Sequence, residues 1–186
     1  MNQATKPFDP TQSIQTSDGF DVLDSCHRQT LFTLGKLSAL IARLEKYREA
    51  DDGARELARE IHHFFSTTGR QHHEDEERHV FPALEASDDA ELVDVIHRLQ
   101  QDHHWLEADW AELAPQLDAI AGGQSWWELD TLRRGAEVFT ALSHDHIALE
   151  ESMIYPQARQ RIAGNGRNEM SREMAARRHA KATERA

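Results

Sequence analysis

The sequence predicts an all-α protein, folded as an antiparallel, up-down-up-down four-helix bundle. Four segments place apolar residues at alternating spacings of three and four, which is the period of one helix face. Period-two runs rich in Val, Ile and Thr, which indicate strands, do not occur in the sequence. We expect residues 18–163 to form the bundle as one domain, with a disordered tail at 1–17 and a charged tail or short helix at 164–186.

The first two predicted helices form one hairpin. The first begins at Gly19 and ends before the sequence Asp51-Asp52-Gly53, which breaks the pattern. Its stripe is Phe20, Leu23, His27, Thr30, Leu34, Leu37, Ile41 and Leu44. The second is predicted over residues 54–84, with Pro82 near its end. Its stripe is Leu57, Ile61, Phe65, Thr68, His72, Glu76, Val80 and Ala83.

The third and fourth predicted helices form a second hairpin. The third starts at about residue 88, and Gly122-Gly123 ends it. Its stripe is Leu92, Ile96, Leu99, His103, Leu106, Trp110, Leu113, Leu117 and Ile120. Ser125 followed by Glu128 predicts a capping box for the fourth helix, which should run to about residue 162. Its stripe is Leu132, Ala136, Phe139, Ser143, His146, Glu150 and Met153.

Composition and charge argue against several classes of function. The 186 residues carry a formal net charge of −12, whereas nucleic-acid binding depends on clustered Lys and Arg. No run approaches the roughly 20 apolar residues that a membrane span requires. The single cysteine, Cys26, excludes an intrachain disulfide, and the polar N-terminal residues lack a signal-peptide core. We therefore expect a cytoplasmic protein with neither nucleic acid nor membrane as partner, whose buried thiol is inert rather than a redox switch.

The two halves of the chain repeat each other. The first stripe maps onto the third at a constant offset of 76 residues, so that His27 corresponds to His103. The motif His-x3-Glu-Glu-x3-aromatic-Pro occurs at residues 72–82 and again, 74 residues later, at 146–156. The chain contains 12 His, about twice the number that ordinary amino-acid usage predicts. The repeat accounts for part of that excess.

The repeat places its polar residues at one level of the predicted bundle. In each antiparallel hairpin the lone His lies as far from the turn as the His of the motif. Residues at i and i+4 share one helix face, so each motif offers a His and a Glu together. His72, rather than His73, is in register with His146 and has a Glu one turn later. Packing of the two hairpins therefore gathers His27, His72, Glu76, His103, His146 and Glu150.

Such a set of donors predicts a metal site. Ionised carboxylates are costly to bury without a partner, so a cation must lie between them. Imidazole and carboxylate donors suit iron, manganese or zinc better than calcium or magnesium. Four His and two carboxylates suit two ions better than one, because the carboxylates can bridge and the His can cap. A lone His on an apolar stripe is more often a hydrogen-bonded core residue, so the prediction depends on the repeat.

This arrangement resembles the hemerythrin HHE cation-binding family. The resemblance covers about residues 19–162 and is carried by an isolated His on the first and third helices and by the repeated motif on the second and fourth. It implies a hemerythrin-like bundle around two iron ions, in an oxo- and carboxylate-bridged centre, with manganese or zinc as alternatives. The ligands that it implies are His27, His72, Glu76, His103, His146 and Glu150.

The chain departs from oxygen-carrying hemerythrins at two places. Those carriers have two His one turn apart on the third helix, whereas no His lies four residues either side of His103. A fifth His ligand is therefore not expected. The carriers also have an acid five residues after the fourth-helix His, which makes Glu151 an alternative ligand to Glu150. His73 is likewise an alternative to His72.

Other polar residues near the motifs are expected beside the site or on the surface. Glu77 can orient a ligand, and so, less directly, can Asp102 and Asp145, which a helix turns about 100° away from the following His. No ligand role is expected for the remaining His residues, except that His73 stays an alternative to His72. They are His62, His63, His73, His79, His97, His104, His144 and His179.

The predicted centre favours small ligands. Open coordination positions predict O2, NO or peroxide as the ligand of a protein that binds or senses it or acts in iron homeostasis. The alternative is a di-iron enzyme or a repair factor for iron centres damaged by nitrosative or oxidative stress, which the count of four His and two Glu resembles. Its partner would be an electron donor or an iron-centre client protein. A structural bundle with incidental His is a third hypothesis, and the oligomeric state stays open.

Overall fold

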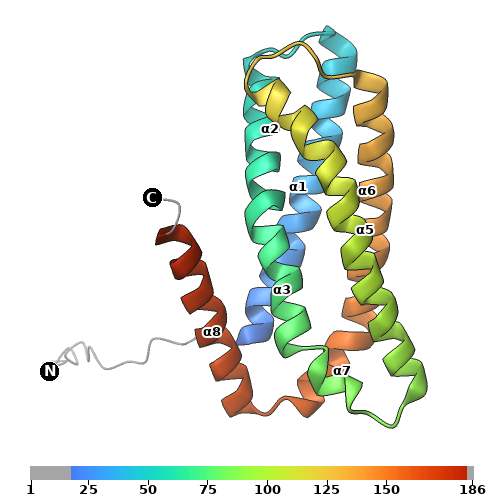
Figure 1. The fold of residues 1–186 in the computed structure, drawn as a ribbon, viewed down its shortest axis with the longest axis vertical. Helices are drawn as coiled ribbons and strands as arrows, with labels where there is room; N and C mark the ends of the chain where they lie inside the picture. Colours follow the sequence, from blue (N-terminus) through green and yellow to red (C-terminus); the bar gives the residue numbers. More distant parts are fainter. Residues whose placement is uncertain (1–17, 184–186) are drawn as a thin grey trace, which may run out of the picture.

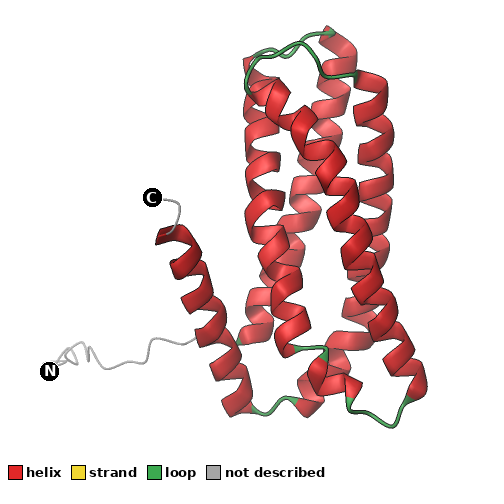
Figure 2. Cartoon of the chain, viewed as in Figure 1, coloured by secondary structure: helices red, strands yellow, loops and turns green. Residues whose placement is uncertain are grey.

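Regular structure in this protein is entirely helical in the part of the chain described, residues 18–183 of a computed structural model (Figure 1). Figure 2 shows the helices joined by short loops. The predicted tail at 1–17 lies outside these residues. No helix among them is long and apolar enough to cross a membrane. The elements are α1 (Gly19–Tyr47), α2 (Asp52–Phe64), η1 (Phe65–Gly69), α3 (Arg70–His79), α4 (Pro82–Glu85), α5 (Ala90–Ala121), α6 (Leu129–Leu149), η2 (Glu150–Ile154), α7 (Tyr155–Arg161) and α8 (Gly164–Thr183).

The long helices lie side by side along the longest axis of the molecule (Figure 1). Helix α1 packs against α2, α2 against α5, α5 against α6, and α6 against α1. Each of these helices therefore has two neighbours and turns its apolar stripe inward. The all-α prediction is confirmed for the described residues.

A layer of polar residues divides the apolar core into two halves. His27 lies between Leu23, which belongs to one half, and Leu34, which belongs to the other. His103 lies in the same way between Leu99 and Leu106. The predicted stripes of α1 and α5 thus cross from one apolar half through the polar layer into the second half.

Two π-helical segments interrupt helices that the sequence predicts as continuous. The segment η1 separates α2 from α3, and η2 separates α6 from α7. A π turn contains one residue more than an α turn, so the residues after it move to a new face. The prediction that Met153 enters the core is therefore wrong, because the fully buried residue is Ile154, one position later.

The predicted capping box at the fourth helix is also wrong. Helix α6 begins at Leu129 with Glu128 as its N-cap residue, and no side chain caps it. Instead, the side-chain oxygen of Gln116 in α5 accepts a hydrogen bond from the backbone N–H of Glu128 at 3.1 Å. A tertiary contact takes the place of the local one that Ser125 would have made.

The C-terminal segment forms helix α8, which packs on α1 and α3. Met170 and Met174 are buried in the same half of the core as Phe20 and Leu23. A Cβ atom on Gly19 would lie 2.6 Å from the Met170 side chain, so glycine is required for this approach. Arg177 and Arg178 both donate hydrogen bonds to the buried carboxylate of Asp75 in α3, at 2.5 and 2.6 Å.

The start of α2 carries a carboxylate with a strongly altered acidity. Two guanidinium nitrogens of Arg43 donate to Asp51 at 2.7 and 2.6 Å, and the backbone N–H of Ala54 donates at 2.9 Å. These hydrogen bonds lower the pKa of Asp51 from 3.8 to about 2. The ionised side chain therefore caps the helix and pairs with α1 at the same time.

Replacing Asp51 by Asn tests this contribution. An acid whose pKa is lowered by folding adds stability above its unfolded-state pKa, and this stability is lost as the pH falls through the folded-state value. We expect the wild type to be more stable than Asp51→Asn at about pH 6, and the difference to shrink as the pH falls from 3.8 towards about 2. Urea unfolding of both proteins over this range measures it. A difference that does not change with pH would contradict the assignment.

Met174→Ala tests the docking of α8. The side chain is completely buried, and truncation of a buried Met to Ala costs about 2–5 kcal/mol. We expect a loss at the lower end of that range in the free energy of chemical unfolding, because α8 is peripheral. Truncation of exposed Arg172 to Ala is the control, with an expected change below about 0.5 kcal/mol. Equal effects of the two substitutions would show that α8 is not docked in solution.

Candidate metal centre

The six residues predicted from the repeat lie together in the polar layer. They come from different helices. His27 lies in α1, His72 and Glu76 in α3, and His103 in α5; His146 lies in α6, and Glu150 is the first residue of η2. Every one of the six is at most 4% exposed. The full set is His27, His72, Glu76, His103, His146 and Glu150.

The donor atoms form two overlapping groups. In the first, which comprises His27, His72 and two carboxylates, His27 Nε2 lies 3.1 Å from Glu150 Oε2, and His72 Nε2 lies 3.4 Å from Glu76 Oε1. All four donor atoms lie within 4.8 Å of one another. Imidazole and carboxylate donors at such distances can surround one cation.

The second group shares both carboxylates with the first. His103 Nε2 lies 3.2 Å from His146 Nε2 and 3.5 Å from Glu76 Oε2. His146 Nε2 lies 3.2 Å from Glu150 Oε1. These four donors also lie within 4.8 Å of one another. The arrangement therefore offers two adjacent cation positions, with each carboxylate facing both.

Several buried polar atoms of the cluster have no hydrogen-bond partner among the described residues. Both oxygens of Glu150, Oε2 of Glu76 and both ring nitrogens of His72 make no hydrogen bond of ordinary geometry, although imidazole nitrogens lie 3.1–3.5 Å from the carboxylate oxygens. A buried acceptor without a partner costs about 1–3 kcal/mol, and more when it is charged. Carboxylate oxygens and the unprotonated nitrogen of a neutral imidazole can each bind a cation, so the donor set fits a pair of metal cations. The unsatisfied atoms are the observation that supports this fit.

The carboxylates perturb each other and the imidazoles beside them. Burial raises the pKa of Glu76, and the neighbouring Glu150 raises it further. Burial also acts on Glu150, but the imidazoles of His146 and His27 hold its pKa well below the ordinary value. Burial would lower the pKa of His146, but the Glu150 carboxylate raises it to about 10. Without a bound cation, side chains of the polar layer, Glu76 and His146 among them, therefore bind protons more readily than usual.

Two further carboxylates brace the lone His residues from outside the cluster. His103 Nδ1 lies 2.9 Å from Glu77 Oε1, and His27 Nδ1 lies 3.1 Å from Glu151 Oε1. Each carboxylate belongs to the opposite hairpin from the His that it contacts. A carboxylate on the outer nitrogen turns the other nitrogen inward and makes it a better metal ligand.

The acidic neighbours of the ligands differ in position. Glu150 is fully buried in the cluster, whereas the alternative, Glu151, is 53% exposed and contacts only the outer side of His27. Asp102 is buried, with Oδ2 3.9 Å from His146 Nδ1. Asp145 is exposed, as helical geometry predicts.

Sequence reasoning missed the role of Tyr155. Its hydroxyl donates a hydrogen bond to Glu76 Oε1 at 2.5 Å and lies 3.2 Å from His27 Nε2. Its ring stacks on His27, with centroids 5.1 Å apart and planes 5° apart. The equivalent aromatic of the first motif, Phe81, stacks in the same way on His103. The repeat was the available signal, because the aromatic residue has a fixed place in both motifs.

His73 was expected on the surface or beside the ligands, and the structure brings it into the cluster. Its Nδ1 atom is buried without a partner, and its ring stacks on His103 with a centroid distance of 4.1 Å. Burial and the neighbouring imidazoles hold the pKa of His73 well below its ordinary value, so the ring is neutral. Four other His residues that were expected outside the site are exposed on the described helices α5, α6 and α8: His97, His104, His144 and His179.

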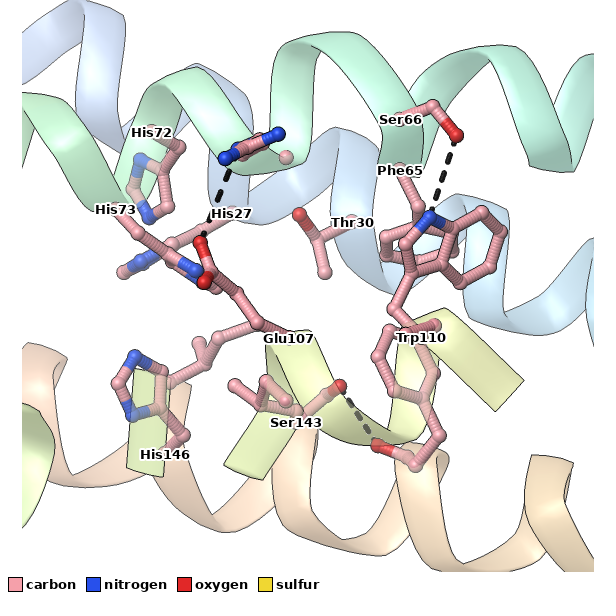
Figure 3. A pocket seen from close by; sticks show the side chains of 16 residues that line it. His27, Thr30, Phe65, Ser66, His72, His73, Glu107, Trp110, Ser143 and His146 are labelled. Carbon is pink, nitrogen blue, oxygen red and sulfur yellow. Dashed lines mark hydrogen bonds and ion pairs between the residues drawn. The ribbon is translucent and has the colours of Figure 1, made fainter. Parts of the chain in front are cut away.

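A cavity of about 300 Å³ leads to the cluster (Figure 3). His27, His72, His73 and His146 line one end of it. Six apolar side chains also line it: Phe65, Leu106, Trp110, Ala111, Phe139 and Ile147. Exposed Arg70 and Glu107 also border the cavity, with Arg70 Nε 3.9 Å from Glu107 Oε1. The cavity is large enough to admit a small molecule to the imidazoles.

Two comparisons relate this chain to known proteins. The sequence model of the protein family described as the hemerythrin HHE cation binding domain matches residues 18–158 of this chain. An uncharacterized protein of Haemophilus influenzae is 27% identical over 174 residues, which cover 94% of this chain and 98% of that protein.

Substitutions of the outer carboxylates test their bracing role. Loss of such a partner typically weakens metal binding about 10–100-fold, and we expect this for both Glu77→Gln and Glu151→Gln. Competition with a chromophoric chelator measures the dissociation constant of Co2+. Asp145→Asn, which neutralises an exposed acid next to His146, is the matched control and should bind as the wild type does. If all three variants bind equally well, the two carboxylates do not support the ligands.

Proposed function

The chain belongs to the hemerythrin HHE cation-binding family, and from this premise we propose that its buried His and Glu cluster holds two iron ions. We also propose the up-down-up-down four-helix bundle of that family as the arrangement of its long helices. The proposed ligands are His27, His72, Glu76, His103, His146 and Glu150.

The overlap of the two donor groups is the observation that supports a pair of ions. Glu76 and Glu150 each face both groups, as bridging carboxylates must. Imidazoles in both groups argue against calcium and magnesium, which prefer oxygen ligands throughout. Iron is our choice because of the family, and manganese or zinc are the alternatives that the same donors suit.

We propose that the centre binds a small molecule, O2, NO or peroxide, for sensing, binding or iron homeostasis. Bound iron would supply redox chemistry and open coordination positions. The cavity beside His27 and His72 supports this function, because it connects the cluster with the exposed pair of Arg70 and Glu107. The apolar side chains along it, Trp110 among them, limit the water that reaches the imidazoles.

An enzyme or repair factor is the second candidate, and Tyr155 favours it. A buried phenol that hydrogen bonds Glu76 places a proton donor inside the cluster. A binding protein forms one adduct and stops, whereas an enzyme turns over. Repeated consumption of peroxide or NO by the reduced protein, with loss in Tyr155→Phe at unchanged iron content, is the result that selects the enzyme.

Metal analysis tests the proposal directly. Anaerobic purification followed by iron quantification should give about two iron ions per chain, and Mössbauer spectroscopy should show coupled iron. Fewer than one iron per chain, without the absorption bands of an oxo bridge, would overturn the proposal of a di-iron centre.

Loss of a ligand should lower both metal content and thermal stability. At a free metal concentration of about 100 times Kd, binding stabilises the native state by about 2.7 kcal/mol. For a domain of this size, that corresponds to about 5–10 °C in Tm. We expect His72→Ala and Glu150→Ala to lose this metal-dependent increment, measured by calorimetry with and without metal. Exposed His144→Ala is the control. An unchanged increment in both ligand variants would favour the structural bundle.

A further inference from the structure

We propose that His73 is an additional metal ligand, a fifth imidazole that binds the cation held by His103 and His146. The inference rests on the proposed metal centre and adds to its ligand set. It concerns a residue that the sequence offered only as a substitute for His72, whereas we propose that both residues bind metal.

Consecutive residues of α3 face different helices. Adjacent positions on a helix are about 100° apart, so His72 and His73 cannot point the same way. The ring of His72 lies 4.7 Å from that of His27 in α1, whereas the ring of His73 lies 4.1 Å from that of His103 in α5. Figure 3 shows both imidazoles directed into the space between the helices. Each thus approaches a different one of the two cation positions.

The donor atoms of His73, His103 and His146 converge. One nitrogen from each ring lies within 4.8 Å of the other two, which is the spacing found within the two main groups. The ring of His73 stacks on that of His103, with planes 12° apart, which fixes it beside the second donor group. The Nδ1 atom of His73 is buried without a hydrogen-bond partner among the described residues. A structural His in a core would normally have satisfied that atom.

His73 also breaks the symmetry of the repeat. At the offset that relates the two motifs, the counterpart of His73 is Ile147, a buried residue that lines the same cavity. Without His73, each cation would have two imidazoles and the two shared carboxylates. With it, one cation has three imidazoles and the other has two. We therefore expect the two positions to bind metal with unequal affinity.

Cobalt titration of the full-length protein tests the inference. Co2+ replaces other divalent metals at mixed His and carboxylate sites, and it shifts the NMR signals of the exchangeable N–H protons of its imidazole ligands far from the rest. We expect five such signals in the wild type and four in His73→Ala. His104 follows His103 in the sequence as His73 follows His72, but it is exposed. His104→Ala is therefore the matched control and should keep five shifted signals.

Affinity gives a second readout. We expect the second Co2+ to bind His73→Ala about 10–100-fold more weakly, and added imidazole to restore its absorption spectrum by filling the space left by the ring. Four shifted signals in the wild type, with equal affinities in all three proteins, would overturn the inference and leave the proposed centre intact. Absence of bound Co2+ in the wild type would overturn both. The count in the wild type is decisive even if a variant fails to fold.

Discussion

Two carboxylates, Glu76 and Glu150, are completely buried at one level of the core, and the rest of the molecule is organised around them. Water cannot reach them, so their charge must be balanced by imidazolium groups or by metal. This requirement explains why an otherwise apolar core is divided into two halves. It also explains why donors come from separate long helices, since no single helix face could surround both carboxylates.

The internal repeat supplies the donors in pairs, and the contacts between the halves hold them in place. Glu77 braces the lone His of the second hairpin, and Glu151 braces that of the first. The stacked aromatic rings also cross between hairpins, as Tyr155 does on His27. Neither hairpin has a complete site alone. Correct docking of the halves and assembly of the centre are therefore the same event.

The helical stripes and the convergence of the six donors could be predicted because both depend on helical periodicity and on distances from the turns. Periodicity failed at η2, since a π turn adds one residue that no spacing rule foresees; Ile154 rather than Met153 enters the core as a result. After η1, by contrast, His72 and Glu76 stay on the predicted stripe. For a related reason, His73 was expected only as an alternative to His72 and not as a further inward residue. One stripe per helix allows one inward His, whereas a helix between two neighbours has two inward faces. The cap expected at Ser125 gave way to a contact from Gln116 in another helix.

The lone sulfhydryl next to His27 has a chemical consequence. Cys26 is 4% exposed, and burial, together with the charge of Glu76, raises its pKa to about 12. Oxidants attack the thiolate, and at neutral pH almost none forms here. If the centre binds peroxide or NO as proposed, the protein can thus keep a cysteine one residue from a proposed ligand without inactivating itself.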